Sequence, residues 1–360
     1  MKIIVMLSIA ILGVTGNLLA QETQKYPIKI SGYAEVYYQH DFSNPLPNQR
    51  SGFIYSHNRN NEINLNLGLL KASYETEKIR SNIGIATGTY MNANYAAEEG
   101  VLKNIYEANI GVRLSEKQQI WLDAGILPSH IGAESAIGLD CFTLTRSIMA
   151  ENSPYFETGA KLSYLSTDNK WQIAVLVLNG WQRIQKLNGN SLPAFGHQLV
   201  FKPTPKVTLN SSSYIGNEKP DAVRQMRYFH NLYAQFELSP KFSLIAVFDI
   251  GAEQKNKNTH QFNMWYSPAV MAKYSLSQKL NVAARLEYYN DKKQVMIATG
   301  SENGFQTFGS SINADYWITP ALAWRVELKN LRSKDRIFTD RDEVLQKNNF
   351  LVATSLAVKF

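Results

Sequence analysis

Apolar and polar residues alternate with a period of two along most of the chain. Between residues 28 and 39, apolar Ile28, Ile30 and Val36 alternate with polar Lys29 and Glu35. The same period returns at residues 62–69, 79–85, 106–114, 120–126, 231–238, 282–289 and 324–329. A two-residue period is typical of strands with one apolar and one polar face, whereas helices repeat every 3.6 residues. The pattern therefore predicts an all-β chain.

The breaks between these segments are of two kinds. Brief, turn-like breaks occur at residues 115–118, 167–170, 203–206, 239–241 and 319–320, and the other breaks are much longer. Tight turns at one end and long polar loops at the other are typical of outer-membrane barrels, with short periplasmic and long extracellular connections. We expect about 16 strands, an even number that places both termini in the periplasm. The predicted fold is a transmembrane, antiparallel, up-and-down β-barrel.

The two ends of the chain carry different signals. Residues 1–20 contain Lys2, an apolar stretch and a small residue, Ala20, which predicts a signal peptide cleaved near that point, although Leu18 departs from the preferred small residue. Residues 21–360 are then one barrel domain. The last residues alternate without a break to Phe360, which is typical of the signal that the outer-membrane assembly machinery reads. A strand ending there would pair with the first strand and remove both sheet edges. The expected location is the bacterial outer membrane.

Three stretches resemble the OmpL-like β-barrel porin family of Gram-negative bacteria, and the likeness covers most of the mature chain. They are residues 123–132 (DAGILPSHIG), 143–156 (TLTRSIMAENSPYF) and 88–96 (GTYMNANYA). The resemblance implies a channel and adds little about the solute. We expect a passive diffusion channel for small hydrophilic solutes or ions.

Charged residues of the alternating segments would face a water-filled lumen if the apolar set faces lipid. A lipid-facing Arg or Lys near mid-membrane would cost about 2–4 kcal/mol. The predicted pore-lining charges of the strands are Arg80, Arg113, Asp123, Arg285, Glu287, Arg325, Glu327 and Lys329. Two interpretations remain open. The pairs Arg285/Glu287 and Arg325/Glu327 could neutralise each other across the sheet, or walls of opposite charge could form a transverse field at a constriction.

The segment 128–153 is long for a connection, and its middle, residues 142–150, could form one or two helical turns. It is the third outer loop in chain order, and in porins that loop folds inward and narrows the pore. We expect the same here, with Glu134, Asp140, Arg146 and Glu151 meeting the lumen arginines. The alternative is a loop that caps the barrel mouth from outside.

Other chemistry has weak support in the sequence. No G-x-S-x-G motif occurs, and Ser129 beside His130 is no evidence of a nucleophile–base pair, so we interpret His130 as a buried structural residue. The acidic group Asp335, Asp340, Asp342 and Glu343 lacks the spacing of a calcium loop and is expected to be solvated. The one cysteine, Cys141, forms no internal disulfide. We predict no metal, no cofactor and no catalysis.

Composition limits the partners. The 37 Lys+Arg and 30 Asp+Glu residues are interspersed, which argues against nucleic acid despite a net charge of +7. The expected partners are outer-membrane lipid, the assembly machinery and small hydrophilic solutes, with a homotrimer as a further expectation. Two other functions stay open, a barrel-embedded enzyme acting on lipid and an adhesin or structural barrel that binds through its loops.

Aromatic residues near the predicted strand ends are expected to form the two interfacial girdles of the barrel. They are Tyr37, Tyr38, Tyr90, Tyr155, Trp171, Trp181, Trp265, Tyr266, Tyr288, Tyr289, Trp317 and Trp324.

Overall fold

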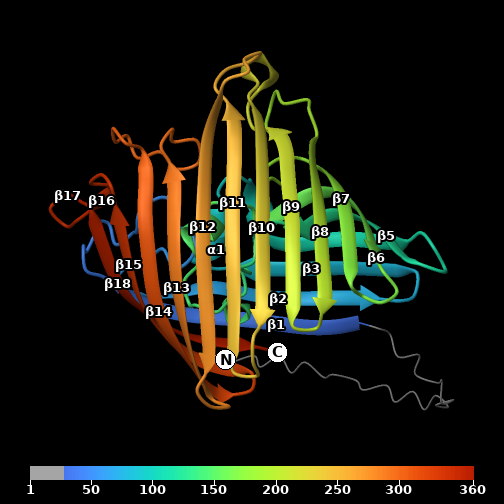
Figure 1. Ribbon diagram of the computed structural model, residues 1–360, viewed down its shortest axis with the longest axis horizontal. Coiled ribbons are helices and arrows are strands. Elements are labelled where there is room, and N and C mark those ends of the chain that lie inside the picture. The colour runs from blue at the N-terminus through green and yellow to red at the C-terminus, as the bar shows by residue number, and fades with distance from the viewer. Residues whose placement is uncertain (1–27) are drawn as a thin grey trace, which may run out of the picture.

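The computed structural model describes residues 28–360, which form a closed antiparallel barrel (Figure 1). Each barrel strand pairs with the barrel strands before and after it in the chain, and the first pairs with the last. The predicted signal peptide lies outside the described residues. The barrel strands are β1 (Ile28–Asp41), β2 (Ile63–Glu75), β3 (Ile79–Thr87), β4 (Ile105–Arg113), β5 (Gln119–Pro128), β6 (Phe156–Leu165), β7 (Trp171–Leu178), β8 (Ala194–Thr204), β9 (Val207–Asn217), β10 (Met226–Glu237), β11 (Phe242–Gln254), β12 (Phe262–Ser275), β13 (Leu280–Asp291), β14 (Phe305–Thr319), β15 (Leu322–Ser333) and β18 (Asn348–Lys359). These are 16 strands, so the predicted fold class and strand number are confirmed.

The remaining elements are short and lie in the long connections. They are the helices α1 (Thr89–Asn94) and α2 (Ile148–Glu151), the 3-10 turns η1 (Gly100–Asn104), η2 (Gly138–Asp140) and η3 (Asp221–Val223), and the hairpin strands β16 (Phe338–Thr339) and β17 (Leu345–Gln346). Within residues 28–360, no helix has the length and apolar character needed to cross a membrane.

The first and last strands close the barrel. β1 pairs with β18 from Tyr33↔Lys359 to Asp41↔Leu351. The ladder continues to the last residue, because Gly32 N donates to Phe360 O at 2.8 Å and Phe360 N donates to Gly32 O at 3.0 Å. No edge of this sheet is left open, as a lipid environment requires.

We expect Phe360→Ala to lower assembly into the outer membrane without weakening the folded barrel. The Phe360 side chain is 69% exposed and lies over Gly32, so its replacement removes few contacts within the protein and should leave the unfolding midpoint close to that of the control below. The measurement is the folded fraction in outer-membrane preparations beside the unfolding midpoint of refolded protein. Phe350→Ala, at another outward-facing residue of β18, is the control. Equal assembly of both variants would contradict a signal role for Phe360.

Residues face the two sides of the sheet largely as the alternation predicts, and β2 contains a clear reversal. The pairing of β1 with β2 shifts where Glu35 pairs with Leu67 and Val36 with Leu65, which leaves Asn66 as an extra residue. A bulge of this kind moves the following side chains to the other face. Leu67 therefore lies in the barrel interior and not against lipid, and Leu69 is buried with it.

The predicted aromatic girdles are partly wrong. Tyr38, Trp171, Tyr266 and Trp324 are exposed on the outer face, as expected for an interfacial position. Six others are buried inside the barrel or pack against its interior clusters. They are Tyr37, Tyr90, Tyr155, Trp181, Trp265 and Tyr289. The reason is that inward-folded loops give these rings apolar partners inside the barrel.

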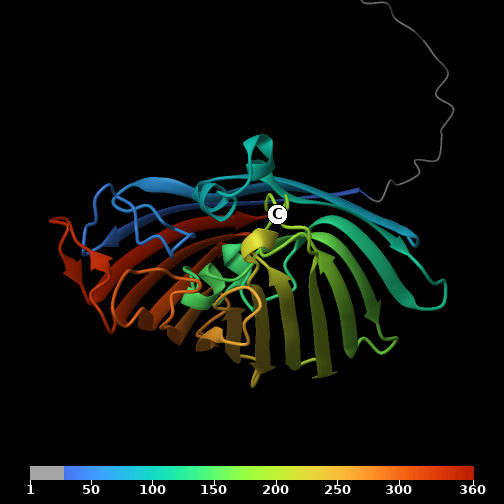
Figure 2. The same cartoon turned by 90° about the horizontal axis from the view of Figure 1, so that it is seen from above.

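The barrel interior is packed and is not an empty tube. Figure 2 shows coil and helical segments within the ring of strands. On one side, Tyr90 and Met91 of α1 pack with Tyr33, Leu67 and Phe156. On the other side, residues of the connection between β5 and β6 pack against the β11–β13 wall in a second apolar cluster, whose members include Phe142, Ile148, Met149, Val247, Met271 and Ala283.

Candidate functional site

The connection between β5 and β6, residues 129–155, crosses the barrel interior and is called the third loop below. The two ends of the loop lie together at the barrel wall, where Ser129 N donates to Tyr155 O at 3.1 Å. Its first part reaches β8 and β9, where Ser212 Oγ donates to His130 O at 2.8 Å. It then descends to the periplasmic ends of β1 and β18, where Gly138 N donates to Tyr33 Oη at 3.0 Å. Residues 141–154 are buried along their whole length.

Five charged side chains of β13 and β15 hold the third loop. This anchor cluster consists of Arg285, Glu287, Arg325, Glu327 and Lys329, whose side chains are almost completely buried. Arg285 Nη1 donates to Thr143 Oγ1 at 2.6 Å and to Thr145 O at 2.7 Å, and Arg285 Nη2 lies 3.1 Å from Glu327 Oε1.

The carboxylates of the anchor cluster accept backbone N–H groups of the loop. Thr145 N donates to Glu327 Oε2 and Ile148 N donates to Glu287 Oε2, each at 2.5 Å. Lys329 Nζ donates to Arg146 O at 3.0 Å. A coil segment inside a barrel cannot leave its peptide groups without partners, and charged partners make the stronger hydrogen bonds. The cluster therefore fixes the loop mainly through its backbone.

Arg325 holds the descending part of the loop. It donates to Gly138 O at 2.7 Å and to Cys141 O at 3.1 Å while pairing with Asp315 at 2.7 Å. Arg285 lies 3.3 Å from Glu287, so this predicted pair is present, whereas Arg325 takes Asp315 in place of the expected Glu327. The structure thus places all five predicted charges on the inner face, where the loop covers them.

The predicted charged residues of the loop differ in whether they contact the lumen arginines. Glu134 lies 3.8 Å from Arg285, as expected for a meeting with a lumen arginine. Asp140 instead pairs with Lys359 at 2.7 Å. Arg146 is buried and donates to carbonyl groups of its own loop, Ser135 O and Leu144 O, each at 2.7 Å. These two do not meet the lumen arginines, because closer partners satisfy them.

Glu151 binds the first loop, residues 42–62. Its Oε2 accepts Tyr55 N and Ser56 N, each at 2.9 Å. Burial raises the pKa of the Glu151 carboxyl above its ordinary value, and the two N–H donors offset part of that rise. The inward folding of the first loop and of α1 was not predicted from the sequence. The signal available in the sequence was the apolar residues Phe53, Ile54 and Met91 within otherwise polar connections.

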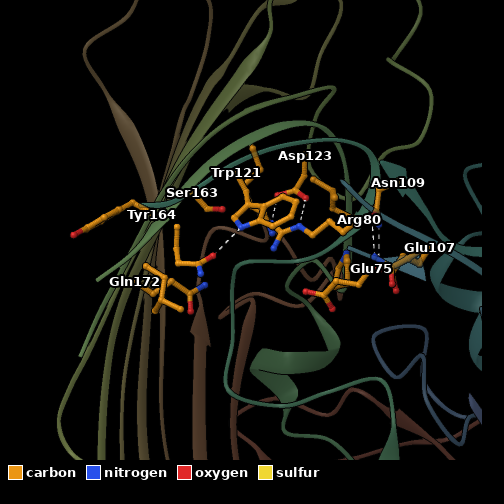
Figure 3. A pocket seen from close by; sticks show the side chains of 15 residues that line it. Glu75, Arg80, Glu107, Asn109, Trp121, Asp123, Ser163, Tyr164 and Gln172 are labelled. Atoms are coloured by element: carbon orange, nitrogen blue, oxygen red, sulfur yellow. Dashed lines mark hydrogen bonds and ion pairs between the residues drawn. The ribbon is translucent and has the colours of Figure 1, made fainter. Parts of the chain in front are cut away.

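A polar vestibule of about 530 Å³ lies in the lumen beside β3–β7 (Figure 3). Arg80 forms a two-bond pair with Asp123, at 2.6 Å and 2.5 Å, and its guanidinium lies 4.4 Å from the centre of the Trp121 ring. Glu107 of the same wall pairs with Lys71 at 2.6 Å. Both Arg80 and Asp123 were predicted to line the lumen. The vestibule offers water and solutes a mixed-charge, hydrogen-bonding surface.

Arg113 is not part of this vestibule. It is the last residue of β4, at the periplasmic end of the strand, and its Nε donates to Gln118 O of the following turn at 3.2 Å. Arg113 has the same inward phase along β4 as Glu107 and Asn109, so its assignment to the pore wall stays a prediction.

The interpretation of His130 as a structural residue is confirmed. Its Nδ1 lies 2.7 Å from Glu157 Oε2 and its Nε2 donates to Ser213 O at 2.8 Å, so both ring nitrogens are used. Ser129 Oγ accepts Ile131 N. Within residues 28–360, no hydrogen bond joins Ser129 Oγ to the His130 ring.

The acidic residues of the last outer loop have protein partners. Asp335 accepts the backbone and side-chain N–H groups of Asn303, and Asp340 accepts Gln346 Nε2 and then the backbone N–H groups of Val344 and Asp342. These hydrogen bonds hold the pKa of both carboxyls below the ordinary range. In the described part of the chain, no group of three or more His, Cys, Asp or Glu residues is arranged to hold a metal ion.

Two solved structures show the same fold at very low sequence identity. In-vitro folded OmpT of Vibrio cholerae, in its trimer form, has 7% identity and a TM-score of 0.59, over 92% of this chain and 99% of that chain. An anion-selective porin from Comamonas acidovorans has 7% identity and a TM-score of 0.60, with the same coverage of both chains. No curated protein matches the sequence. The family model described as "Putative beta-barrel porin-2, OmpL-like" matches residues 27–360, and the chain therefore belongs to this outer-membrane porin family.

Proposed function

We propose that the protein is a passive diffusion channel for small hydrophilic solutes or ions, with the third loop as its constriction and the vestibule beside β3–β7 as its periplasmic entrance. The observation that carries the proposal is that the third loop crosses the lumen and is bound there by the anchor cluster. A segment fixed across a barrel sets the width of any passage beside it. The channel performs no chemistry on the solute.

The loop has one face that supports a passage. Residues 141–154 are buried, whereas Gly132, Ala133, Ile137 and Asp140 are at least partly exposed. A solute path beside residues 132–140 leads toward the vestibule, where Arg80 and Asp123 stand. Opposite charges in such a path screen solutes by charge as well as by size.

Partners follow from this function. Outer-membrane lipid surrounds the barrel, the assembly machinery receives the strand that ends at Phe360, and the chain is exported by a cleaved signal peptide. We also propose that the barrel self-associates, as the trimer form of OmpT does, with a homotrimer as the expected assembly.

The test is single-channel conductance of the refolded mature chain in a planar bilayer with a salt gradient. Steady openings are expected. Arg80→Gln should then shift the reversal potential toward cations, because the Asp123 carboxylate loses its partner inside the vestibule. A partly solvated pair of this kind is worth roughly 0.5–1 kcal/mol, which corresponds to an about two- to fivefold change in the cation-to-anion permeability ratio.

Lys78→Gln is the matched control, because Lys78 pairs with Glu116 at an exposed periplasmic turn. It should leave the reversal potential unchanged. Silence from a verified folded barrel would overturn the channel proposal. Steady openings with equal reversal potentials for wild type and Arg80→Gln would remove the vestibule from the solute path.

A further inference from the structure

A row of polar side chains lies on the outer wall of the barrel, across β8, β9 and β10, which stand side by side in Figure 1. His197 and His230 are both register partners of Ser213, and Ser211 is two residues from Ser213 on the same strand. We call His197, Ser211, Ser213 and His230 the outer polar row. Nothing in the channel proposal uses these residues.

The direction of the row follows from its neighbours in sequence. Gln198 and Ser212 point into the lumen, where both donate to His130 O. Asn231 also points inward, with its Oδ1 accepting Gly132 N of the third loop. Because successive side chains of a strand alternate between faces, His197, Ser211, Ser213 and His230 point outward.

The row lies within the apolar band and not at its rim. Two residues closer to the extracellular ends of the strands than His197, Ser213 and His230 lie Phe195, Ile215 and Tyr228, respectively. Their side chains are exposed and also point outward from the barrel. Leu199 and Leu232 follow on the periplasmic side. The outer wall of a barrel carries an apolar band at this depth, so a polar row there is unexpected for a surface that faces acyl chains.

The polar groups satisfy one another in part. Ser213 Oγ lies 2.5 Å from His197 Nδ1, and Ser211 Oγ lies 3.2 Å from His230 Nε2. His230 Nδ1 has no hydrogen-bond partner among residues 28–360. Leaving a polar group without a partner in an apolar medium costs free energy, and lipid tails offer no partner.

A shallow hollow of about 340 Å³ adjoins the row. Its lining includes Ser213 and His230 together with the outward-facing Tyr228, Ala252 and Met264. A hollow beside hydroxyl and imidazole groups fits a protein surface that inserts a side chain and supplies hydrogen bonds. Acyl chains can fill the hollow but cannot supply the bonds.

We propose that the outer polar row is the contact surface through which this barrel binds a second copy of itself. The row carries both kinds of group that such a contact needs, since a hydroxyl donates and an imidazole nitrogen accepts. A second copy brings the same groups to the same membrane depth. The inference rests on the proposed self-association and is independent of conductance.

The experiment measures the mass of the folded full-length mature chain in mild detergent and in lipid nanodiscs, by native mass spectrometry. Wild type is expected as an oligomer. The double variant His197→Phe/His230→Phe keeps a ring of similar size and removes the polar nitrogens. It is expected to raise the apparent Kd of association at least about tenfold and to leave single barrels. Leu286→Phe, at an exposed outward position of β13, is the matched control and should keep the wild-type mass.

Each result has one meaning. A wild type that is monomeric in both media overturns the proposed self-association and the inference with it. An oligomeric wild type with an equally oligomeric double variant overturns the assigned surface alone. Ser213→Leu serves as the second variant if the double variant does not fold, and it too is expected to dissociate. Hydrolysis of phospholipid by wild type that Ser213→Leu abolishes would replace the contact surface with a lipid-acting site.

Discussion

Replacing Arg285 with alanine is expected to destabilise the folded barrel by about 3–5 kcal/mol and to increase its conductance, because it removes the cation at the centre of the anchor cluster. Glu287 lies 3.3 Å and Glu327 lies 3.1 Å from the guanidinium, and both carboxylates would remain buried. Thr143 and Thr145 lose their donor at the same time. The third loop should then leave the β13–β15 wall and widen the passage. Unfolding in urea and single-channel recording give the two readouts.

Arg285→Lys and Arg113→Ala serve as comparisons. Lysine keeps the charge without the planar fork, so an intermediate loss of stability is expected. Arg113 is a partly exposed arginine at a periplasmic turn, and its replacement should change the free energy of unfolding by no more than about 0.5 kcal/mol. Wild-type conductance together with wild-type stability for Arg285→Ala would contradict the anchoring role of the cluster.

Replacing residues 130–154 with a tight turn is expected to give the largest conductance of any variant considered. β5 and β6 are antiparallel neighbours, and Ser129 N already donates to Tyr155 O, so a turn of about four or five residues can join them. All strand pairs remain, while the segment that fills the lumen is gone. A barrel of this strand number leaves an aqueous channel when nothing plugs it. Planar-bilayer recording measures the increase.

The control removes residues 341–344, which form the exposed tip of the β16–β17 hairpin in the last outer loop. This deletion is expected to keep the wild-type conductance. If the shortened third loop also kept that conductance, the first loop and α1 would be the segments that close the barrel.

The sequence predicted the strands well because lipid imposes a strict alternation on a membrane-spanning strand. In β15, Trp324, Val326 and Leu328 face outward, and Arg325 and Glu327 face inward as predicted. The alternation cannot reveal a bulge, since one extra residue leaves the period on either side unchanged. This is why Leu67, which the period over residues 62–69 groups with the apolar lipid-facing residues, lies on the opposite face.

The partners of the inward charges could not be predicted in the same way. Whether Arg285 faces water or a peptide depends on where a loop 140 residues away in sequence folds, and no local pattern carries that information. The apolar residues Phe142, Ile148 and Met149 were consistent with either an inward loop or an outward cap. Their inward position depends on apolar residues of β11–β13, which form a complementary surface only in the closed barrel.

The contacts of the anchor cluster also imply an order for the folding steps. Thr145 and Glu327 are separated by 182 residues, and Ile148 and Glu287 by 139, so vectorial export delivers the loop long before the strands that hold it. The descending part of the loop further binds Tyr33 and Lys359, which flank the junction of the first and last strands. The loop therefore cannot finish docking until the last strand has arrived. A nascent barrel remains unplugged and pliable during insertion and becomes a rigid, narrow conduit only when its circumference is complete.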